Sequence, residues 1–230
     1  AHALGLQPWR ASELPVDSPP YLIWHTEPGS PAGDAAPAPD FDPTDSVLVV
    51  DRAYAPLRLD GEAPELSPHA WQLWSPNKAL GLTGVRGAYA VAPERGAVTA
   101  ELVDWLQQQL DRLAPSWPLG VDGVALLSAW VQADTQDWLA QSLATLRQWK
   151  AAQLRLCADL GWAVLPGSLA NFFTARPPVP DLAAALQALR AQGIKLRDCA
   201  SFGLAGHVRL GVLAPAAQRA LAAAWRQWAP

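Results

Sequence analysis

The chain has 230 residues, of which half are hydrophobic and 17% are charged, and its net charge at pH 7 is −4. This composition is typical of a protein with a substantial core, and it lacks the excess of basic residues found in nucleic-acid-binding proteins. Two isolated cysteines and four scattered histidines match no disulfide framework and no metal-binding motif, so we expect no metal site and a reducing, cytoplasmic environment. The sequence has no long apolar run and no secretory signal, so we expect neither a membrane span nor export.

Four short apolar runs in the first ninety residues are bounded by proline, glycine and aspartate: 21–25, 46–51, 71–74 and 86–92. Their hydrophobicity is continuous rather than alternating, which predicts strands buried on both faces, as in a parallel sheet covered by helices. The proline-rich connection between the first two runs is long for a structureless loop and is therefore expected to be functional. Residues 1–6 are expected to form the end of a helix that turns at Gly5.

The pattern changes after Pro93 to longer helical segments. A helix is predicted to start at an N-cap, Thr99, followed by leucines at helical spacing: Leu102, Leu106, Leu110 and Leu113. Residues 121–132 and 134–161 continue the helical pattern, and the second segment ends at a glycine. Strands are then predicted at 162–166, 171–176, 195–198 and 207–213, with helices at 181–193 and 215–228. We therefore expect an α/β fold with part of a large domain over 1–95 and a small α+β domain over 96–230.

Lys78 is one of only three lysines, against fourteen arginines, and it lies among small residues after the third predicted strand. Pro76 and Gly81 flank it and predict a loop at the edge of the sheet, where α/β proteins bind ligands. A lysine on such a turn is most often a solvated surface residue. Here, however, Ser75 precedes it by three residues and Arg86 follows it by eight. The Ser75 hydroxyl and the Arg86 guanidinium therefore flank the amine. A cofactor that carries both an aldehyde and a phosphate would require such groups beside the attacking amine. The other lysines are expected in a helix and a later strand, away from this site: Lys150 and Lys195.

Asp51 ends the second predicted strand, and Tyr54 follows three residues later. A carboxylate at a strand end is often only a turn former. Next to a pyridine cofactor it would instead keep the ring nitrogen protonated, and the Tyr54 phenol could donate a hydrogen bond to the ring hydroxyl.

The order Asp-x-x-Tyr, then Ser-x-x-Lys followed by a glycine and a later arginine, resembles the class I/II aminotransferases, which are fold-type I pyridoxal-phosphate enzymes. The pattern falls on Asp51, Tyr54, Ser75, Lys78, Gly81 and Arg86. Within that family the chain is similar to the histidinol-phosphate aminotransferase branch, which includes threonine-phosphate decarboxylases. The resemblance implies a Schiff base between Lys78 and pyridoxal 5'-phosphate, with Ser75 and Arg86 at the cofactor phosphate.

The C-terminal part agrees with this resemblance. Residues 193–212 resemble the closing motif of the branch, in which two arginines, here Arg197 and Arg209, hold the anionic end of the substrate. Residues 168–173 resemble its small-domain strand around Asn171. Two such arginines are otherwise ordinary solvated charges, but guanidinium groups bind carboxylate or phosphate bidentately and would orient a substrate.

The chain departs from the family pattern at several positions near the cofactor. Ser30 stands where the family has an asparagine that bonds the ring hydroxyl, Arg52 replaces an acid, and Asn77 replaces a serine. The family's glycine-rich phosphate turn and the aromatic that stacks on the ring have no match. The chain is therefore expected to begin partway through the large domain.

The resemblance implies a homodimeric enzyme that transfers amino groups between amino acids and 2-oxo acids, with Lys78 also acting as general base and acid. The same residues could decarboxylate a phosphorylated amino acid, because the bond that breaks is the one held perpendicular to the cofactor ring. A non-catalytic descendant that keeps the fold for binding or assembly is a further alternative, and Ser30 and Arg52 favour it.

Overall fold

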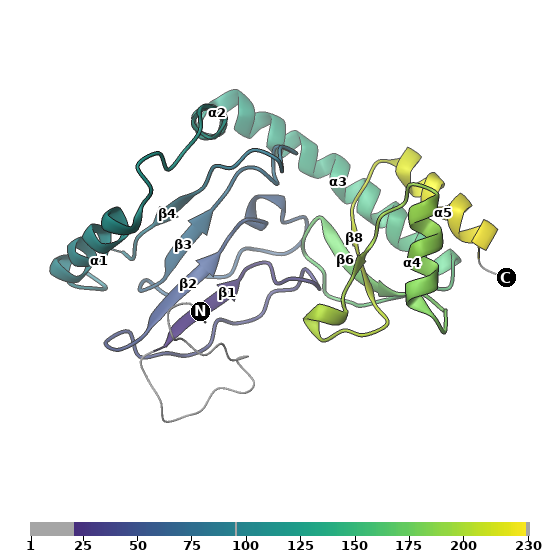
Figure 1. Ribbon diagram of the computed structural model, residues 1–230, viewed down its shortest axis with the longest axis horizontal. Coiled ribbons are helices and arrows are strands. Elements are labelled where there is room, and N and C mark those ends of the chain that lie inside the picture. Colours follow the sequence, from purple (N-terminus) through teal and green to yellow (C-terminus); the bar gives the residue numbers. More distant parts are fainter. Residues whose placement is uncertain (1–20, 95, 229–230) are drawn as a thin grey trace.

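The computed structural model describes residues 21–94 and 96–228. Two four-stranded sheets lie at opposite ends of the molecule, and a long helix, α3 (Ala133–Asp159), runs from one to the other (Figure 1). The helix end expected at residues 1–6 lies outside the described residues. Among the helices of the described part of the chain, none is both long and apolar enough to cross a membrane.

The first sheet contains β1 (Leu22–Thr26), β2 (Val47–Asp51), β3 (Trp71–Trp74) and β4 (Tyr89–Val91), in that order. The first three strands are parallel, as predicted, but β4 pairs antiparallel with β3. The expectation of a wholly parallel sheet is therefore wrong. The connection between β3 and β4 contains turns but no helix that would carry the chain back across the sheet, and a parallel pairing would need such a crossover.

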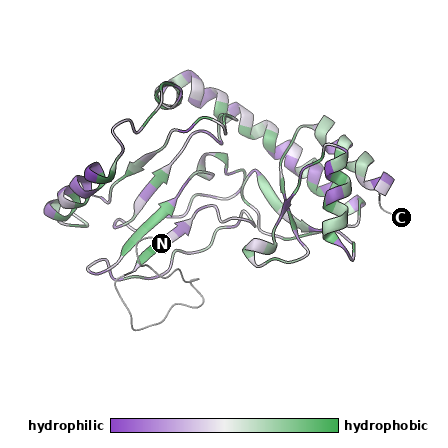
Figure 2. Cartoon of the chain, in the orientation of Figure 1, coloured by the Kyte–Doolittle hydropathy of each residue, from purple (hydrophilic) through white to green (hydrophobic). Residues whose placement is uncertain are grey.

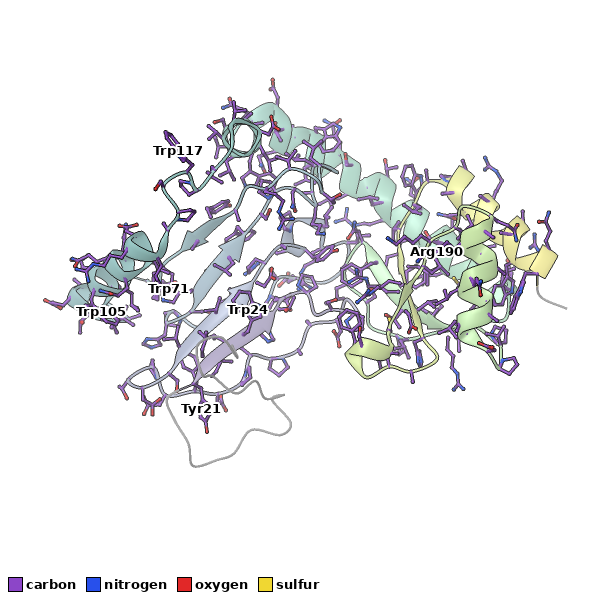
Figure 3. All side chains as sticks on the ribbon, in the orientation of Figure 1. Tyr21, Trp24, Trp71, Trp105, Trp117 and Arg190 are labelled. Carbon is purple, nitrogen blue, oxygen red and sulfur yellow. The ribbon has the colours of Figure 1, made fainter. Side chains whose placement is uncertain are left out.

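One face of the first sheet is covered and the other is largely open. Leu48 and Val50 of β2 are buried against Ile23, Phe41 and Leu66, which belong to β1 and to two loops rather than to covering helices. Figure 2 shows the hydrophobic colouring of β2. On the other face of β1, Leu22 and Trp24 are 60% and 59% exposed, and Trp24 stands out from the ribbon in Figure 3. The prediction that both faces are buried by helices is therefore wrong for the described residues.

Three helices follow the first sheet: α1 (Ala100–Leu113), α2 (Val121–Trp130) and α3. The Thr99 hydroxyl accepts a hydrogen bond from the backbone N–H of Leu102 at 3.2 Å, so the predicted N-cap is confirmed. Early in α3, Leu139 packs on Leu57 of the short 3₁₀ helix η3 (Ala55–Leu57), while Cys157 near its end belongs to the core of the second sheet. Because α3 contacts both units, a domain boundary near residue 95 stays a prediction.

The second sheet contains β5 (Ala163–Val164), β6 (Phe172–Arg176), β7 (Arg197–Asp198) and β8 (Val208–Gly211), all antiparallel in the order β5-β6-β8-β7. The 3₁₀ helix η4 (Ala200–Phe202) follows β7, and α4 (Leu182–Ala191) and α5 (Pro215–Trp228) pack on the sheet. Phe173, Leu189 and Trp225 lie in this core. The expected α+β arrangement of strands and helices is present.

The loop between β1 and β2 docks on the second sheet. Gly33 has a φ of +79°, and its carbonyl accepts a hydrogen bond from the N–H of Leu169 at 2.7 Å. A Cβ at Gly33 would lie 2.8 Å from the Ser168 hydroxyl oxygen and 3.0 Å from the Phe172 carbonyl oxygen, so only glycine fits this close approach. Thr174 of β6 donates a hydrogen bond to the Pro31 carbonyl at 2.7 Å. These contacts fix the position of residues 29–34 next to β6.

Hydrogen bonds from α3 also hold the segments next to η3 and β6 in place. The buried Lys150 ammonium donates to the Asp60 carboxylate at 3.0 Å and to the Ser168 carbonyl at 2.6 Å. Arg147 donates to the Leu59 carbonyl at 2.6 Å. One helix therefore holds the segment after η3 and the segment before β6, which are themselves joined by a hydrogen bond from the Leu59 N–H to the Leu169 carbonyl at 2.7 Å.

Candidate active site

A cavity of about 360 Å³ lies between the turn after β3, η3 and the second sheet. The residues that line it include five of those predicted from the sequence: Tyr54, Lys78, Asn171, Arg197 and Arg209. They come from separate segments of the chain, so their convergence depends on how the loops and turns of the first sheet dock on the second sheet.

A tight turn places Lys78 at the end of β3. The N–H of Leu80 donates to the Pro76 carbonyl and that of Gly81 to the Lys78 carbonyl, and Gly81 adopts a φ of +69°. The neighbouring Ala79 is buried in a cluster with Leu57 and Leu139, which anchors the turn. The Lys78 Nζ lies 5.6 Å from the centroid of the Tyr54 ring. The sequence expectation of a lysine on a loop at the sheet edge is met.

Two aromatic rings separate the lysine from an arginine. Tyr54 meets Phe172 edge to face, with ring centroids 4.7 Å apart. The Arg209 guanidinium carbon lies 5.2 Å from the centroid of the Phe172 ring, and the Arg209 Nη1 donates to the Ser30 hydroxyl at 2.9 Å. Ser30 thus contacts the expected substrate arginine, a contact that the sequence did not predict.

The cavity is positively charged and contains an unpaired polar atom. Arg197 of β7 and Arg209 of β8 are directly opposite each other in the antiparallel pairing, and no acidic residue is among those that line the cavity. Within 21–94 and 96–228, the ion pairs are Arg58 with Glu27 and Lys150 with Asp60, so neither arginine is neutralised there. The Asn171 Oδ1 is buried without a hydrogen-bond partner. This arrangement can accept an anionic ligand that also donates hydrogen bonds.

Asp51 lies at the carboxyl end of β2 but is not among the residues that line this cavity. Its carboxylate accepts a hydrogen bond from the Ala53 N–H at 3.0 Å. The next residue, Arg52, is buried, with its guanidinium carbon 4.7 Å from the centroid of the Trp74 ring, and burial lowers the pKa of Arg52. The roles assigned to Asp51 from the sequence stay predictions.

The two residues expected at the cofactor phosphate also lie outside the cavity lining. Ser75 donates its hydroxyl hydrogen to the Gly87 carbonyl at 2.7 Å, and Arg86 is exposed. Asn77 is buried, and its Nδ2 donates to the Val85 carbonyl at 3.5 Å. Phosphate binding by Ser75 and Arg86 therefore stays a prediction.

Lys195 was expected to lie away from the site, and this expectation is wrong, because Lys195 lines the cavity. The chain leaves α4 through a turn at Gly193, whose φ is +79°, and then runs directly into β7. Residues 195–197 thereby reach the edge of β8. A signal was present in the sequence: Lys195 precedes Arg197 by two residues, and alternate residues of an extended segment share a side.

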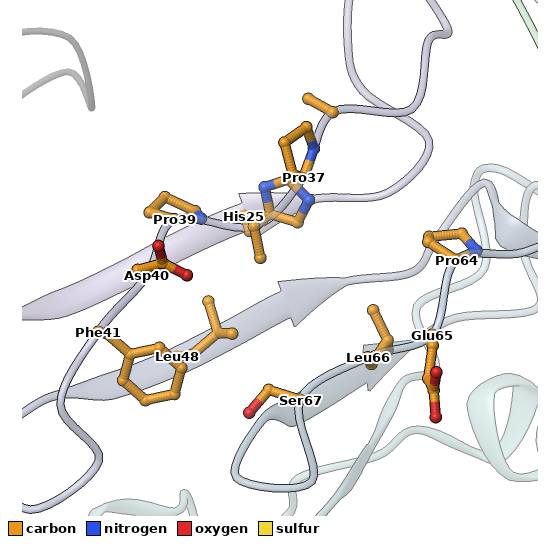
Figure 4. Close-up of a pocket in the computed structure, with 12 residues that line it drawn as sticks. His25, Pro37, Pro39, Asp40, Phe41, Leu48, Pro64, Glu65, Leu66 and Ser67 are labelled. Carbon is orange, nitrogen blue, oxygen red and sulfur yellow. The ribbon is translucent and has the colours of Figure 1, made fainter.

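A larger cavity of about 460 Å³ lies elsewhere, between the covered face of β1 and β2 and two proline-containing loops (Figure 4). His25, Asp40 and Glu65 supply its charged or titratable groups, and none of the predicted site residues lines it. Burial lowers the pKa of His25, and a backbone hydrogen bond with Ala36 opposes that shift. With no lysine or arginine in its lining, this cavity lacks the groups for the predicted chemistry.

Within residues 21–94 and 96–228, the cysteines and the potential metal ligands offer no competing centre. Cys157 and Cys199 are both buried, and burial raises the pKa of Cys157 to about 12. Among the described residues, no cluster of three or more His, Cys, Asp or Glu side chains could hold a metal ion. The smaller cavity around Lys78 is therefore the candidate active site.

Comparisons with known proteins show the family to which the chain is similar. Residues 10–224 match the family model described as "Aminotransferase class I and II". The chain is 28% identical over 216 residues to a histidinol-phosphate aminotransferase of Nitratidesulfovibrio vulgaris, a match that covers 89% of this chain and 54% of that protein. The chain spans about half the length of the curated relatives it matches.

Solved structures share the fold. An aspartate aminotransferase from Thermus thermophilus, solved with maleate, superposes with a TM-score of 0.70 at 21% identity, over 91% of this chain and 56% of that one. A decarboxylase from Sulfurospirillum multivorans superposes with a TM-score of 0.69 at 16% identity, over 90% and 61% of the two chains.

Proposed function

The chain belongs to the aminotransferase class I and II family, and on this basis we propose that it transfers amino groups with pyridoxal 5'-phosphate attached to Lys78. The family works with this cofactor. The main support for the assignment of Lys78 is that it shares one cavity with Tyr54, Asn171, Arg197 and Arg209.

The groups in this cavity fit the cofactor. Lys78 supplies a primary amine for its aldehyde, and Tyr54 supplies a phenol for its ring hydroxyl. The buried Asn171 Oδ1 has no partner within the described residues and can accept a hydrogen bond from a bound molecule. Asp51, at the end of β2 and outside the cavity lining, would hold the positive charge of the ring nitrogen.

When bound, pyridoxal phosphate supplies an electron sink that lowers the cost of breaking a bond at the substrate α-carbon. The Lys78 Nζ would hold the cofactor covalently and would move the proton at that carbon as base and then as acid. Tyr54 lies beside this amine and can donate its phenolic hydrogen to the cofactor oxygen.

Arg209 would bind the substrate carboxylate. Its guanidinium is held by the Ser30 hydroxyl on one side and by the Phe172 ring on another, so its orientation is fixed before a ligand binds. A pre-oriented guanidinium can form two parallel hydrogen bonds with a carboxylate. Amino acids and 2-oxo acids would be the substrates, and a second copy of the chain would be the partner.

Decarboxylation is a second candidate function. The structure of a decarboxylase shares the fold of this chain, and the excess of positive charge in the cavity suits an amino acid with a second anionic group. Product analysis separates the two reactions, because decarboxylation releases carbon dioxide and amino transfer requires a 2-oxo acid.

The first experiment is to locate the cofactor. The purified protein would be incubated with pyridoxal phosphate, reduced with borohydride and digested, and the modified peptide identified by mass spectrometry. We expect modification at Lys78 alone. Lys78→Arg keeps the positive charge but cannot form the linkage, so it should remain unmodified. Modification of Lys150 or Lys195 in the unsubstituted protein would refute the assignment, and no modification at all would favour a binding role without catalysis.

A further inference from the structure

The second sheet places two arginines where like charges repel each other. Arg197 and Arg209 are direct cross-strand neighbours in the β7–β8 pair. Like charges at such positions destabilise a sheet. The Ser201 hydroxyl at 3.4 Å from Arg197 and the Ser30 hydroxyl at 2.9 Å from Arg209 are neutral partners and cannot compensate the charges.

A third cation adds to this repulsion. Lys195 lies two residues before Arg197 and lines the same cavity. Neither a hydrogen bond nor an ion pair of Lys195 occurs among the described residues. Asp198, the acid next along the chain, accepts a hydrogen bond from the Ala200 N–H and is not part of the cavity lining. Together with Lys78, four cations thus line one cavity that offers no carboxylate.

We propose that Lys195 is a third anion-binding residue and that it makes this cavity select substrates whose distal group carries two negative charges. The statement that the ligand is a substrate rests on the proposed function. With Lys78 engaged by the cofactor, one guanidinium is matched by the substrate carboxylate. The remaining guanidinium and the Lys195 ammonium match a dianion, which is either one phosphate monoester or a further pair of carboxylates.

The ordinary alternative is that Lys195 is a solvated surface charge. Its side chain is exposed, and most exposed lysines have no specific ligand. The two interpretations differ in a measurable way. A surface charge affects every anion weakly and similarly, whereas a binding residue affects dianions more than monoanions and can be replaced by arginine but not by an uncharged side chain.

The test uses the purified protein without added cofactor, titrated calorimetrically with inorganic phosphate, succinate and acetate at constant ionic strength. A pH of about 8 keeps phosphate mostly dianionic. The variants are Lys195→Met, which keeps the length of the side chain, and Lys195→Arg, which keeps its charge. Arg190→Met is the matched control, because Arg190 is exposed on α4 outside the cavity lining and its loss changes the net charge equally (Figure 3).

We expect Lys195→Met to weaken dianion binding by about fivefold to tenfold. This factor lies between the contribution of an exposed ion pair to binding and the larger contribution of a hydrogen bond between charged groups. Acetate binding should change less than twofold by this reasoning, and Lys195→Arg should retain dianion binding. A larger effect on phosphate than on succinate identifies a phosphate monoester as the distal group, and the reverse identifies two carboxylates.

Several results would overturn the inference. Unchanged dianion binding in Lys195→Met, an equal loss in Arg190→Met, or no dianion binding by the unsubstituted protein would each do so. The outcome is separable from that of the proposed function. If Lys78 carries the cofactor but Lys195→Met binds dianions normally, only this inference fails. If Lys78 remains unmodified but Lys195→Met weakens dianion binding, the proposed function fails and the anion site stands.

Discussion

Replacement of Lys150 by methionine is expected to destabilise the protein, because Lys150 connects α3 to the two segments beside the candidate active site. Its Nζ donates to the Ser168 carbonyl at 2.6 Å and to the Asp60 carboxylate at 3.0 Å. The two contacts differ in environment: the Lys150 side chain is 6% exposed, whereas that of Asp60 is 57% exposed. The bond to the carbonyl is therefore expected to contribute most of the stability.

The expected magnitude follows from these environments. A hydrogen bond from a charged donor contributes about 1.5–3 kcal/mol, and an ion pair with an exposed partner contributes at most about 1 kcal/mol. Methionine retains the apolar packing of the lysine stem, so Lys150→Met should lower the free energy of unfolding by about 2–4 kcal/mol. Asp60→Asn is the matched control. It should cost less than about 1 kcal/mol, since water can replace the exposed carboxylate.

Urea unfolding followed by tryptophan fluorescence would measure both variants, and the chain contains twelve tryptophans. A loss below about 1 kcal/mol for Lys150→Met would show that the bond to Ser168 contributes little. An equal or larger loss for Asp60→Asn would show that the carboxylate, rather than the carbonyl, is the important partner. Either result would refute the reasoning given above.

Two further predictions concern the loop at Ser30 and the cysteines. Ser30→Ala should weaken anion binding about twofold to tenfold through the lost 2.9 Å bond to Arg209, while Ser30→Thr should retain it. Calorimetry with succinate measures this, and weaker cofactor attachment with unchanged anion binding would show that Ser30 acts at the cofactor ring instead. Neither Cys157 nor Cys199 should react with Ellman's reagent at neutral pH until the protein unfolds, since burial raises the pKa of both thiols. Because the pKa of Cys157 rises from 9.0 to about 12, its thiol ionises earlier in the unfolded chain, and stability should fall as the pH rises from 9.0 towards 12. Rapid labelling of the folded protein would contradict the assigned burial.

Most of the secondary structure could be predicted from local patterns. The Thr99 hydroxyl caps the first turn of α1, and Gly161 ends α3 in a left-handed conformation. Both effects act within one helical turn, and both occur where expected. The direction of β4 could not be predicted in this way. An apolar run such as 86–92 has the same composition in a parallel and an antiparallel pairing, and only the path of the connecting segment decides between them.

The candidate site also combines features that the local sequence predicts with contacts that only the fold reveals. The spacing of Asp51, Tyr54, Ser75 and Lys78 identified the family, and the family model confirms that resemblance. The same spacing did not reveal that Ser75 already bonds the Gly87 carbonyl, because that contact depends on the fold of the turn between them. Lys195 was misplaced for a similar reason: its distance from Lys78 in sequence gave no indication that both line one cavity.

The sequence by itself determined the order of the elements, the family and the position of Lys78 on a turn after β3, because each depends on residues close together along the chain. Only the tertiary structure decided which distant residues meet. Ser30 and Arg209 are 179 positions apart, and they form a hydrogen bond because Gly33 has no side chain to hold the loop away from β6. The concentration of Lys195, Arg197 and Arg209 around one cavity likewise results from how α4, β7 and β8 pack, since charge repulsion alone would separate these residues.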